Sequence, residues 1–120
     1  MKLHGIQVKL THRSVPESIP AEVSLCLYRV TQECLHNVAK HSAAREAGVA
    51  IEGDKDGILL SVTDSGTGFD PSLVADQSGL GIVGIRERVR LVDGVVSINS
   101  QPGRGTQIDV RVPMTKRMDP

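Results

Sequence analysis

An acid, an amide and a base recur on one side of a segment whose other positions are mostly apolar. Glu33, Asn37 and Lys40 stand four and three residues apart. An α-helix turns about 100° per residue, so residues at this spacing share one face. A carboxylate, an amide oxygen and an ammonium group on one wall suit a phosphate with a bound divalent cation. We therefore expect the chemistry of this protein to lie along this helix.

The same segment carries an apolar stripe that would hold the helix against a core. Pro20 stands where a first-turn proline is tolerated, and the helix it opens is predicted to run to about His41 or beyond. The stripe lies next to the polar face and consists of Val23, Leu27, Val30, Cys34 and Val38.

An aspartate and a threonine occupy strand positions where alternation calls for apolar residues. In the strand predicted over residues 58–64, Asp64 follows three apolar residues of the same parity, and Thr106 precedes three in the strand over 106–112. A buried carboxylate needs a hydrogen-bond donor, and the exocyclic amine of a purine would serve. The alternative is an aspartate that ends its strand and accepts from turn amides. The strand pattern alone leaves both open.

Two glycine-rich segments frame a polar loop after Asp64. Gly66 and Gly68 alternate with polar residues, which lets backbone approach a ligand closely. Residues 79–84 spell G-x-G-x-x-G at the start of a second predicted helix, where free backbone N–H groups suit phosphates. The dinucleotide fingerprint requires a strand directly before this motif, and here a long polar loop precedes it. Phosphate binding and a simple glycine hinge both remain open.

The order of elements predicts an α+β fold. A strand near Ile6 to Leu10 precedes the first helix, a hairpin joins strands beginning at Val49 and Ile58 through residues 53–57, and a helix over 80–92 stops at Gly94. A second hairpin pairs residues 95–100 with 106–112. Without repeated βαβ units, we predict a two-layer α/β sandwich with a mostly antiparallel sheet and helices on one face. We expect residues 1–113 to form one domain and residues 114–120 to form a flexible tail.

Composition excludes several classes of protein. Lysine plus arginine equals aspartate plus glutamate at 14 each, and the 120 residues include one Phe, one Tyr and no Trp, so we expect no nucleic-acid partner. Cys26 and Cys34 share a helix about 12 Å apart, too far to bridge each other, which favours a reduced cytoplasmic setting. No apolar run approaches the roughly 20 residues of a membrane span, so we expect this chain to be soluble and without direct membrane contact. We also expect it to be a fragment of a longer protein.

Three motifs in order resemble those of one family. Gln32 to His41 resembles the N box, Asp64 to Phe69 the G1 box, and Gly79 to Arg88 the G2 box of the catalytic ATP-binding domain of bacterial sensor histidine kinases. The sequences of these motifs are most similar to those of the nitrate-sensor and thermosensor subfamily. Residues 103–106 resemble the family's terminal glycine-threonine motif. The resemblance implies the Bergerat fold, which DNA gyrase and mismatch-repair ATPases share.

The resemblance also implies a role for each matching residue. Asn37 would hold Mg²⁺ with Glu33 ordering the metal shell, and these two form the catalytic pair. Asp64 would accept from the adenine amine, supported by Thr106 and water. Lys40 and His41 would face the phosphates. Gly66, Gly68 and Phe69 would shape the adenine pocket. Gly79, Leu80 and Gly81 would close over the triphosphate.

The implied function is that of a protein histidine kinase in two-component signal transduction. The domain would bind Mg·ATP and present its γ-phosphate to a histidine on a separate dimerisation domain, and a response regulator would take part in the phosphorelay. None of the four histidines here suits the acceptor role, so the chain should not phosphorylate itself alone. The arginines of residues 86–90 are either a solvated helix face or a docking surface for the acceptor domain. Alternatives are a Bergerat ATPase or anti-sigma serine kinase, with Glu33 as general base, and a non-catalytic interaction module.

Overall fold

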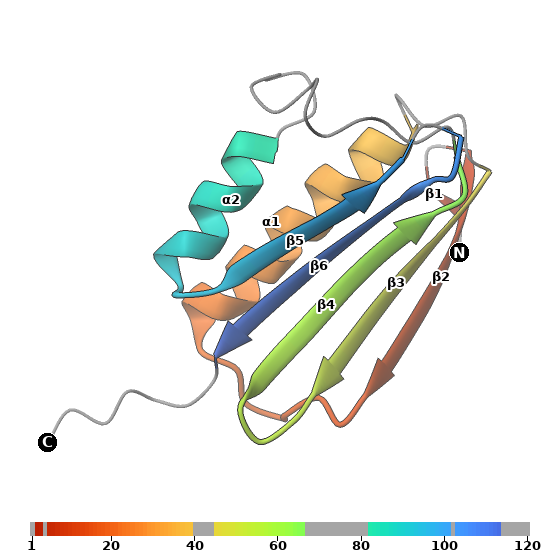
Figure 1. The fold of residues 1–120 in the computed structure, drawn as a ribbon. Coiled ribbons are helices and arrows are strands. Elements are labelled where there is room, and N and C mark those ends of the chain that lie inside the picture. Colours follow the sequence, from red (N-terminus) through yellow and green to blue (C-terminus); the bar gives the residue numbers. More distant parts are fainter. Residues whose placement is uncertain (1, 4, 40–44, 67–81, 102, 114–120) are drawn as a thin grey trace, which may run out of the picture.

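The computed structural model of the 120-residue chain describes residues 2–3, 5–39, 45–66, 82–101 and 103–113. In these ranges two helices lie on one face of a single sheet, and the opposite face of the sheet is uncovered (Figure 1). The predicted two-layer α+β sandwich is therefore confirmed. The elements in chain order are β1 (Lys2–Leu3), β2 (Ile6–Arg13), α1 (Ala21–Asn37), β3 (Glu46–Gly53), β4 (Gly57–Asp64), α2 (Ile82–Leu91), β5 (Val95–Ser100) and β6 (Thr106–Pro113).

The sheet has the strand order β1-β2-β3-β4-β6-β5. Strands β2 and β3, which α1 connects, are parallel, and every other neighbouring pair of strands described is antiparallel. This confirms the prediction of a mostly antiparallel sheet. The two-residue strand β1 was not predicted, and Gly5, with φ +81°, lies in the turn that brings it back along β2.

The apolar stripe of α1 is buried as predicted, and it fixes the helix against the sheet. The stripe also includes Cys26 and Leu35, which the sequence pattern did not single out. Pro20 is the N-cap residue, and its carbonyl accepts hydrogen bonds from the N–H groups of Val23 and Ser24 at 3.0 Å each. The Cys26 thiol donates to the carbonyl of Arg88 at 3.6 Å, which links α1 to α2.

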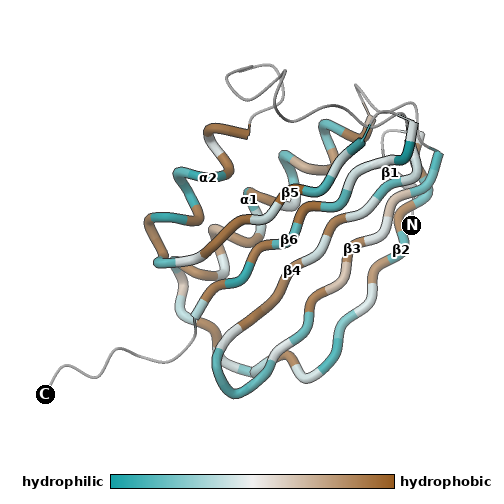
Figure 2. Tube along the Cα trace, in the orientation of Figure 1, coloured by the Kyte–Doolittle hydropathy of each residue, from teal (hydrophilic) through white to brown (hydrophobic). Residues whose placement is uncertain are grey.

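The sheet face under the helices is built in rows, because residues paired across neighbouring strands point to the same side. Ile98, Ile108 and Val62 of β5, β6 and β4 form one such row, here called the apolar row. Hydrophobic residues also follow one another in the first half of β4 (Figure 2). The core consists of several rows of this kind closed by the helix stripes, and Ile58, Leu60 and Val110 within it are fully buried.

The uncovered face of the sheet is polar and locally cross-linked. The Ser61 hydroxyl donates to Asp109 at 2.6 Å across β4 and β6, and Gln107 donates to the same carboxylate at 3.1 Å. Arg13 pairs with Glu52 on the neighbouring strand. These contacts agree with a sheet that packs one face and exposes the other to water.

Two details differ from the sequence-based expectation, and a third agrees with it. Leu10 follows the parity of Ile6 and Val8 but is 58% exposed, because α1 does not cover this part of β2. Strand β3 begins at Glu46, three residues before the predicted Val49. The predicted stop of the second helix at Gly94 agrees with α2, which ends at Leu91, and Asp93 after it adopts the left-handed conformation with φ +62°.

Gly94 contributes to the end of α2 in another way. Its N–H donates to the Val89 carbonyl at 2.8 Å while that of Asp93 donates to Arg90, the pairing of a Schellman motif. A β-carbon at Gly94 would lie 2.7 Å from Val89 Cγ1 and 2.8 Å from the Arg111 carbonyl. Close packing therefore requires a glycine at this position, whereas the backbone conformation does not require one.

Candidate functional site

Asp64 is the last residue of β4 and points to the helix-covered face, as the parity of the strand predicted. One of its carboxylate oxygens, Oδ1, accepts a hydrogen bond from the backbone N–H of Gly66 at 2.7 Å. Burial raises the pKa of the Asp64 carboxyl above its ordinary value of 3.8, and the Gly66 N–H partly offsets this shift. The interpretation in which the aspartate ends its strand and accepts from a turn amide is therefore confirmed. The contact with a purine amine stays a prediction, and the half-buried carboxylate lies beside a hollow.

Thr106 and Ser100 lie in register with Asp64 and complete a polar row. Thr106 of β6 pairs with Asp64 on one side and with Ser100 of β5 on the other, and these three residues are here called the site row. The hydroxyl oxygens of Ser100 and Thr106 are 2.8 Å apart, and the Ser100 hydroxyl donates to the Gly105 carbonyl at 3.1 Å. The site row lies directly beyond the apolar row, where the strands end.

The β5–β6 turn brings backbone unusually close to Asp64. Gly105 has φ +81°, and a β-carbon there would lie 2.3 Å from the Asp64 carbonyl oxygen. Gly103 has a similar φ of +80°, but a β-carbon there would meet no described atom within 4 Å. Both glycines adopt positive φ, but only Gly105 is also required by close approach.

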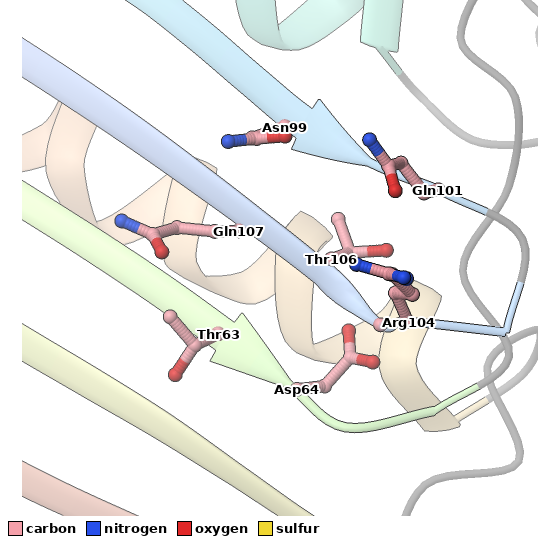
Figure 3. A pocket seen from close by; sticks show the side chains of 8 residues that line it. Thr63, Asp64, Asn99, Gln101, Arg104, Thr106 and Gln107 are labelled. Carbon is pink, nitrogen blue, oxygen red and sulfur yellow. The ribbon is translucent and has the colours of Figure 1, made fainter.

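A hollow of about 340 Å³ lies at this end of the sheet. Asp64 and Thr106 line it together with Thr63 and Gln107 from the uncovered face and Arg104 from the β5–β6 turn (Figure 3). The Asp64 carboxylate is directed toward Thr106 and Arg104 in this view. The hollow thus offers carboxylate, hydroxyl, amide and guanidinium groups at this end of the sheet.

The polar face of α1 reaches the same end of the sheet. Glu33 and Asn37 lie one turn apart near the C-terminal end of α1, both half-buried, and the Oδ1 atom of Asn37 is shielded from solvent. This end of α1 and the beginning of α2 lie toward the end of the sheet where β4 stops (Figure 1). The pKa of the neighbouring Cys34 thiol is raised to about 12 by burial and by the charge of Glu33.

Several predicted site residues lie outside the ranges that the structure describes. The described part of the site holds Glu33, Asn37, Asp64, Gly66 and Thr106. The predictions for the phosphate-facing pair, the second half of the G1 box and the start of the G2 box fall on undescribed residues, namely Lys40, His41, Gly68, Phe69, Gly79, Leu80 and Gly81.

A family model matches most of the chain and covers every element of the site. Residues 22–116 match the model described as histidine kinase-, DNA gyrase B-, and HSP90-like ATPase. The chain belongs to this ATPase family. Two curated relatives are the signal transduction histidine-protein kinase/phosphatase DegS of Brevibacillus brevis, 36% identical over 111 residues, and the oxygen sensor histidine kinase NreB of Staphylococcus carnosus, 34% identical over 114 residues.

The chain spans about a third of the length of these curated relatives. It covers 28% of DegS and 33% of NreB, while 92% and 95% of this chain takes part in the two alignments. The family membership therefore describes one domain of proteins of this kind, and the matched relatives are sensor histidine kinases.

Solved structures of histidine kinases share the fold. The mycobacterial sensor histidine kinase MprB matches with a TM-score of 0.71 and 27% identity, over 91% of this chain and 82% of that one. The ATP-binding domain of PrrB from Mycobacterium tuberculosis matches with a TM-score of 0.64 and 20% identity, over 93% and 82%. The blue-light activated histidine kinase EL346 of Erythrobacter litoralis reaches a TM-score of 0.75 at 18% identity, over 94% and 36%. The site row therefore stands in a fold that histidine kinase ATP-binding domains adopt. Neither helix within the described ranges is long and apolar enough to cross a membrane.

Sequence reasoning did not identify Ser100 as part of the site, although the signal was present. Ser100 has the parity of Val96 and Ile98, and it is a polar residue where the alternation calls for an apolar one. The same argument that selected Asp64 and Thr106 would have selected it. The side chain of Ser100 is 6% exposed, and among the described residues Ser100 is the one buried polar residue.

Proposed function

We propose that this chain is the catalytic ATP-binding domain of a sensor histidine kinase, a transferase that acts in a two-component phosphorelay. The observation that carries the proposal is the site row, where a half-buried carboxylate and a hydroxyl lie in register at one end of the sheet. The end of α1 that carries Glu33 and Asn37 lies toward the same end of the sheet. A half-buried carboxylate beside an aliphatic layer suits an adenine base, whose amine donates and whose ring needs apolar contact. Membership in an ATPase family supports the same ligand.

The described residues have distinct roles in this proposal. Asp64 accepts from the adenine amine through the carboxylate oxygen that Gly66 does not occupy. Thr106 supports this contact directly or through a water molecule, and Gly66 allows the chain to leave the strand against the base. As the family resemblance implies, Gly68 and Phe69 would also shape the adenine pocket. The residues that would face the phosphates or close over them are Lys40, His41, Gly79, Leu80 and Gly81.

The pair on α1 fits a magnesium ion. Glu33 and Asn37 supply a carboxylate and an amide oxygen one turn apart, and hard cations such as Mg²⁺ prefer oxygen ligands. Mg²⁺ commonly takes only one or two protein ligands and completes its shell with phosphates and water, so no cluster of three acidic or histidine ligands is needed. Within the described ranges no such cluster occurs. The ion would neutralise charge on the phosphates, while the protein holds the nucleotide in place.

The reaction served by the domain is phosphoryl transfer to a histidine of the parent's dimerisation domain. That histidine attacks the γ-phosphorus in line, the bond to the bridging oxygen breaks, and ADP leaves. Positioning supplies most of the rate, so the domain alone, without its nucleophile, has little to accelerate. The response regulator of the pathway would then receive the phosphoryl group. We place the domain in the cytoplasm, with its parent either soluble or membrane-anchored.

A titration and a labelling assay test this proposal. We expect the chain to bind Mg·ATP saturably, to incorporate no label from γ-labelled ATP by itself, and to label the parent's dimerisation domain when this is added. Asn37→Asp keeps an oxygen ligand and should retain magnesium-dependent binding, whereas Asn37→Leu should lose it. Absence of ATP binding would favour an interaction module instead. Substantial ATP hydrolysis without acceptor would favour an autonomous ATPase with Glu33 as general base.

A further inference from the structure

Leu10 faces the helix-covered side of the sheet, but no described helix covers it. It pairs with Val49 of β3, which pairs with Val62, so these residues continue the apolar row to β2. Val49 and Val62 are each 3% exposed, whereas Leu10 is 58% exposed. The core therefore ends one strand before the last residue of its own row.

The spacing of the helices shows which part of the helix layer is open. Among the strands, α1 packs mainly against β4, and α2 packs against β5, which lies two strands away. Two strand spacings are about 9.6 Å, close to the roughly 8–10 Å between packed helices. A helix at the same distance on the other side of α1 would lie over β2, which is two strands from β4 in that direction. Within the described ranges no helix lies there, and both helices lie toward the β5 side of the sheet (Figure 1).

Tyr28 stands on the side of α1 that borders this open position. Cys26 points toward α2, since its thiol contacts the Arg88 carbonyl, and two residues further on the helix has turned by about 200°. Tyr28 thus lies on the side of α1 away from α2, and it is 58% exposed. Leu10 on the sheet and Tyr28 on the helix therefore border the same open position with large exposed side chains.

The exposed Tyr28 side chain is held in place by its neighbours. Gln32 Nε2 donates to the Tyr28 hydroxyl at 3.2 Å, and Arg29 donates to Gln32 Oε1 at 3.3 Å. The guanidinium carbon of Arg29 lies 5.9 Å from the centre of the Tyr28 ring. A side chain that is ordered before binding loses little entropy when a partner covers it.

Arg29 adds a charge to this surface. It has no acidic partner among the described residues, whose ion pairs involve other arginines. A molecule that covers Leu10 and Tyr28 would therefore gain from apolar side chains and from a carboxylate placed beside Arg29.

We infer that an amphipathic α-helix from another part of the parent kinase packs over β2 beside α1, with apolar side chains on Leu10 and Tyr28 and a carboxylate beside Arg29. This inference rests on the proposed function, in which the chain is one domain of a longer protein, as the lengths of the curated relatives indicate. Two large side chains offer less surface than the roughly 1,000 Å² that holds separate proteins together. A helix on the same polypeptide docks at a high effective concentration, so this small surface is sufficient.

Cysteine labelling of Leu10→Cys in the 120-residue chain and in the parent tests this inference. The native Cys26 and Cys34 are 5% and 2% exposed, so a maleimide should react with them slowly. We expect the new thiol at position 10 to react rapidly in the chain and at least about tenfold more slowly in the parent. Val95→Cys, at a position of β5 that is 67% exposed, is the matched control and should react equally fast in both proteins.

The charge at position 29 supplies a second readout. In the parent that carries Leu10→Cys, Arg29→Glu should oppose the carboxylate of the docked helix and raise the labelling rate about threefold or more, whereas Arg29→Lys should not. If Leu10→Cys does not fold, Tyr28→Cys allows the same comparison of chain and parent from the α1 side.

The outcomes separate this inference from the function on which it rests. Equal labelling rates at position 10 in the chain and in the parent would overturn it. Protection in the chain alone would overturn it as well, and would assign the surface to a second copy if the protection grows with protein concentration, or to the chain's own residues if it does not. A parent that is protected at position 10, together with a chain that binds no ATP, would contradict the proposed function and leave the docked helix in place.

Discussion

Two neighbouring rows on the same face of the sheet have opposite character. The apolar row, Ile98, Ile108 and Val62, packs under the helices, and the site row, Ser100, Thr106 and Asp64, lies one step further along the same three strands. The apolar row contributes through burial and the site row through directed hydrogen bonds. Because the polar residues stand where the strands end, the site can hold a half-buried carboxylate without interrupting the core.

The largest effect is expected from placing a carboxylate in the apolar row, next to the site row. Val62→Asp would bury a charge at a position that is 3% exposed, with no donor supplied by its apolar neighbours. We expect a loss of more than ~4 kcal/mol, enough to abolish cooperative unfolding in urea. Thr63→Asp, on the neighbouring position of the uncovered face, is the matched control and should change stability by less than ~1 kcal/mol. Similar urea midpoints for the two variants would contradict the distinction between the rows.

A pair of glycine variants measures the close approach at the site row. Gly103→Ala and Gly105→Ala both place an alanine at positive φ, but only the second brings a β-carbon 2.3 Å from the Asp64 carbonyl. We expect Gly103→Ala to lower the free energy of unfolding by ~1 kcal/mol and Gly105→Ala by ~2–4 kcal/mol. The Gly105 variant should also bind ATP more weakly, because Asp64 must shift. Chemical denaturation and ATP titration of both variants would check this, and equal losses would mean that the turn has room to adjust.

The pH dependence should differ in sign between ATP binding and the stability of the free domain. The pKa of Asp64 is raised on folding, so its effect on stability is favourable below the ordinary value of 3.8 and is lost as the pH rises through the raised pKa. ATP requires the ionised carboxylate, so affinity should instead fall as the pH drops through that same pKa. At about pH 7.5 the wild-type chain should bind ATP more tightly than Asp64→Asn does, and this difference in affinity should shrink as the pH is lowered. A difference in affinity that stays constant over the whole pH range would contradict an ionised acceptor.

The smallest effect is expected at a position remote from both rows. Asp93 ends α2 with φ +62°, a conformation that glycine adopts without strain. Asp93→Gly should change the free energy of unfolding by less than ~1 kcal/mol, with relief of strain opposed by greater freedom of the unfolded chain. ATP affinity should stay the same, which would set the baseline for the variants in the rows. Differential scanning calorimetry and one ATP titration are sufficient, and a clear loss of affinity would show that α2 is coupled to the site.

Sequence patterns predicted the described fold well where periodicity was strong. Alternation in β4 and β6 and the stripe of α1 placed the core and the inward direction of Asp64 and Thr106. The exposure of Leu10 could not be predicted, because parity gives the face of a strand and not the extent of the helix that covers it. The sequence predicts the stop of the second helix at Gly94, but not that Asp93 adopts the left-handed conformation there or that close packing requires the glycine.

The site was only partly predictable, for a similar reason. The sequence indicated which residues leave the apolar pattern, but not which of them come into register across strands that are distant in the chain. Ser100 and Thr106 meet because β5 and β6 pair around Gly105, and Asp64 joins them because β4 is the other neighbour of β6. The contacts within this row follow from the pairing of the strands and could not be obtained from composition or spacing.

Asp64→Asn tests the central claim most directly when binding and stability are measured on the same protein. The asparagine oxygen can still accept from Gly66 N–H, and no buried charge remains, so we predict an unfolding free energy equal to or slightly above that of the wild type. Calorimetric titration with Mg·ATP should show an affinity lower by ~10- to 100-fold, the size of a hydrogen bond to a charged group. Unchanged ATP affinity together with a marked loss of stability would contradict the account, because Asp64 would then be a structural residue of the sheet.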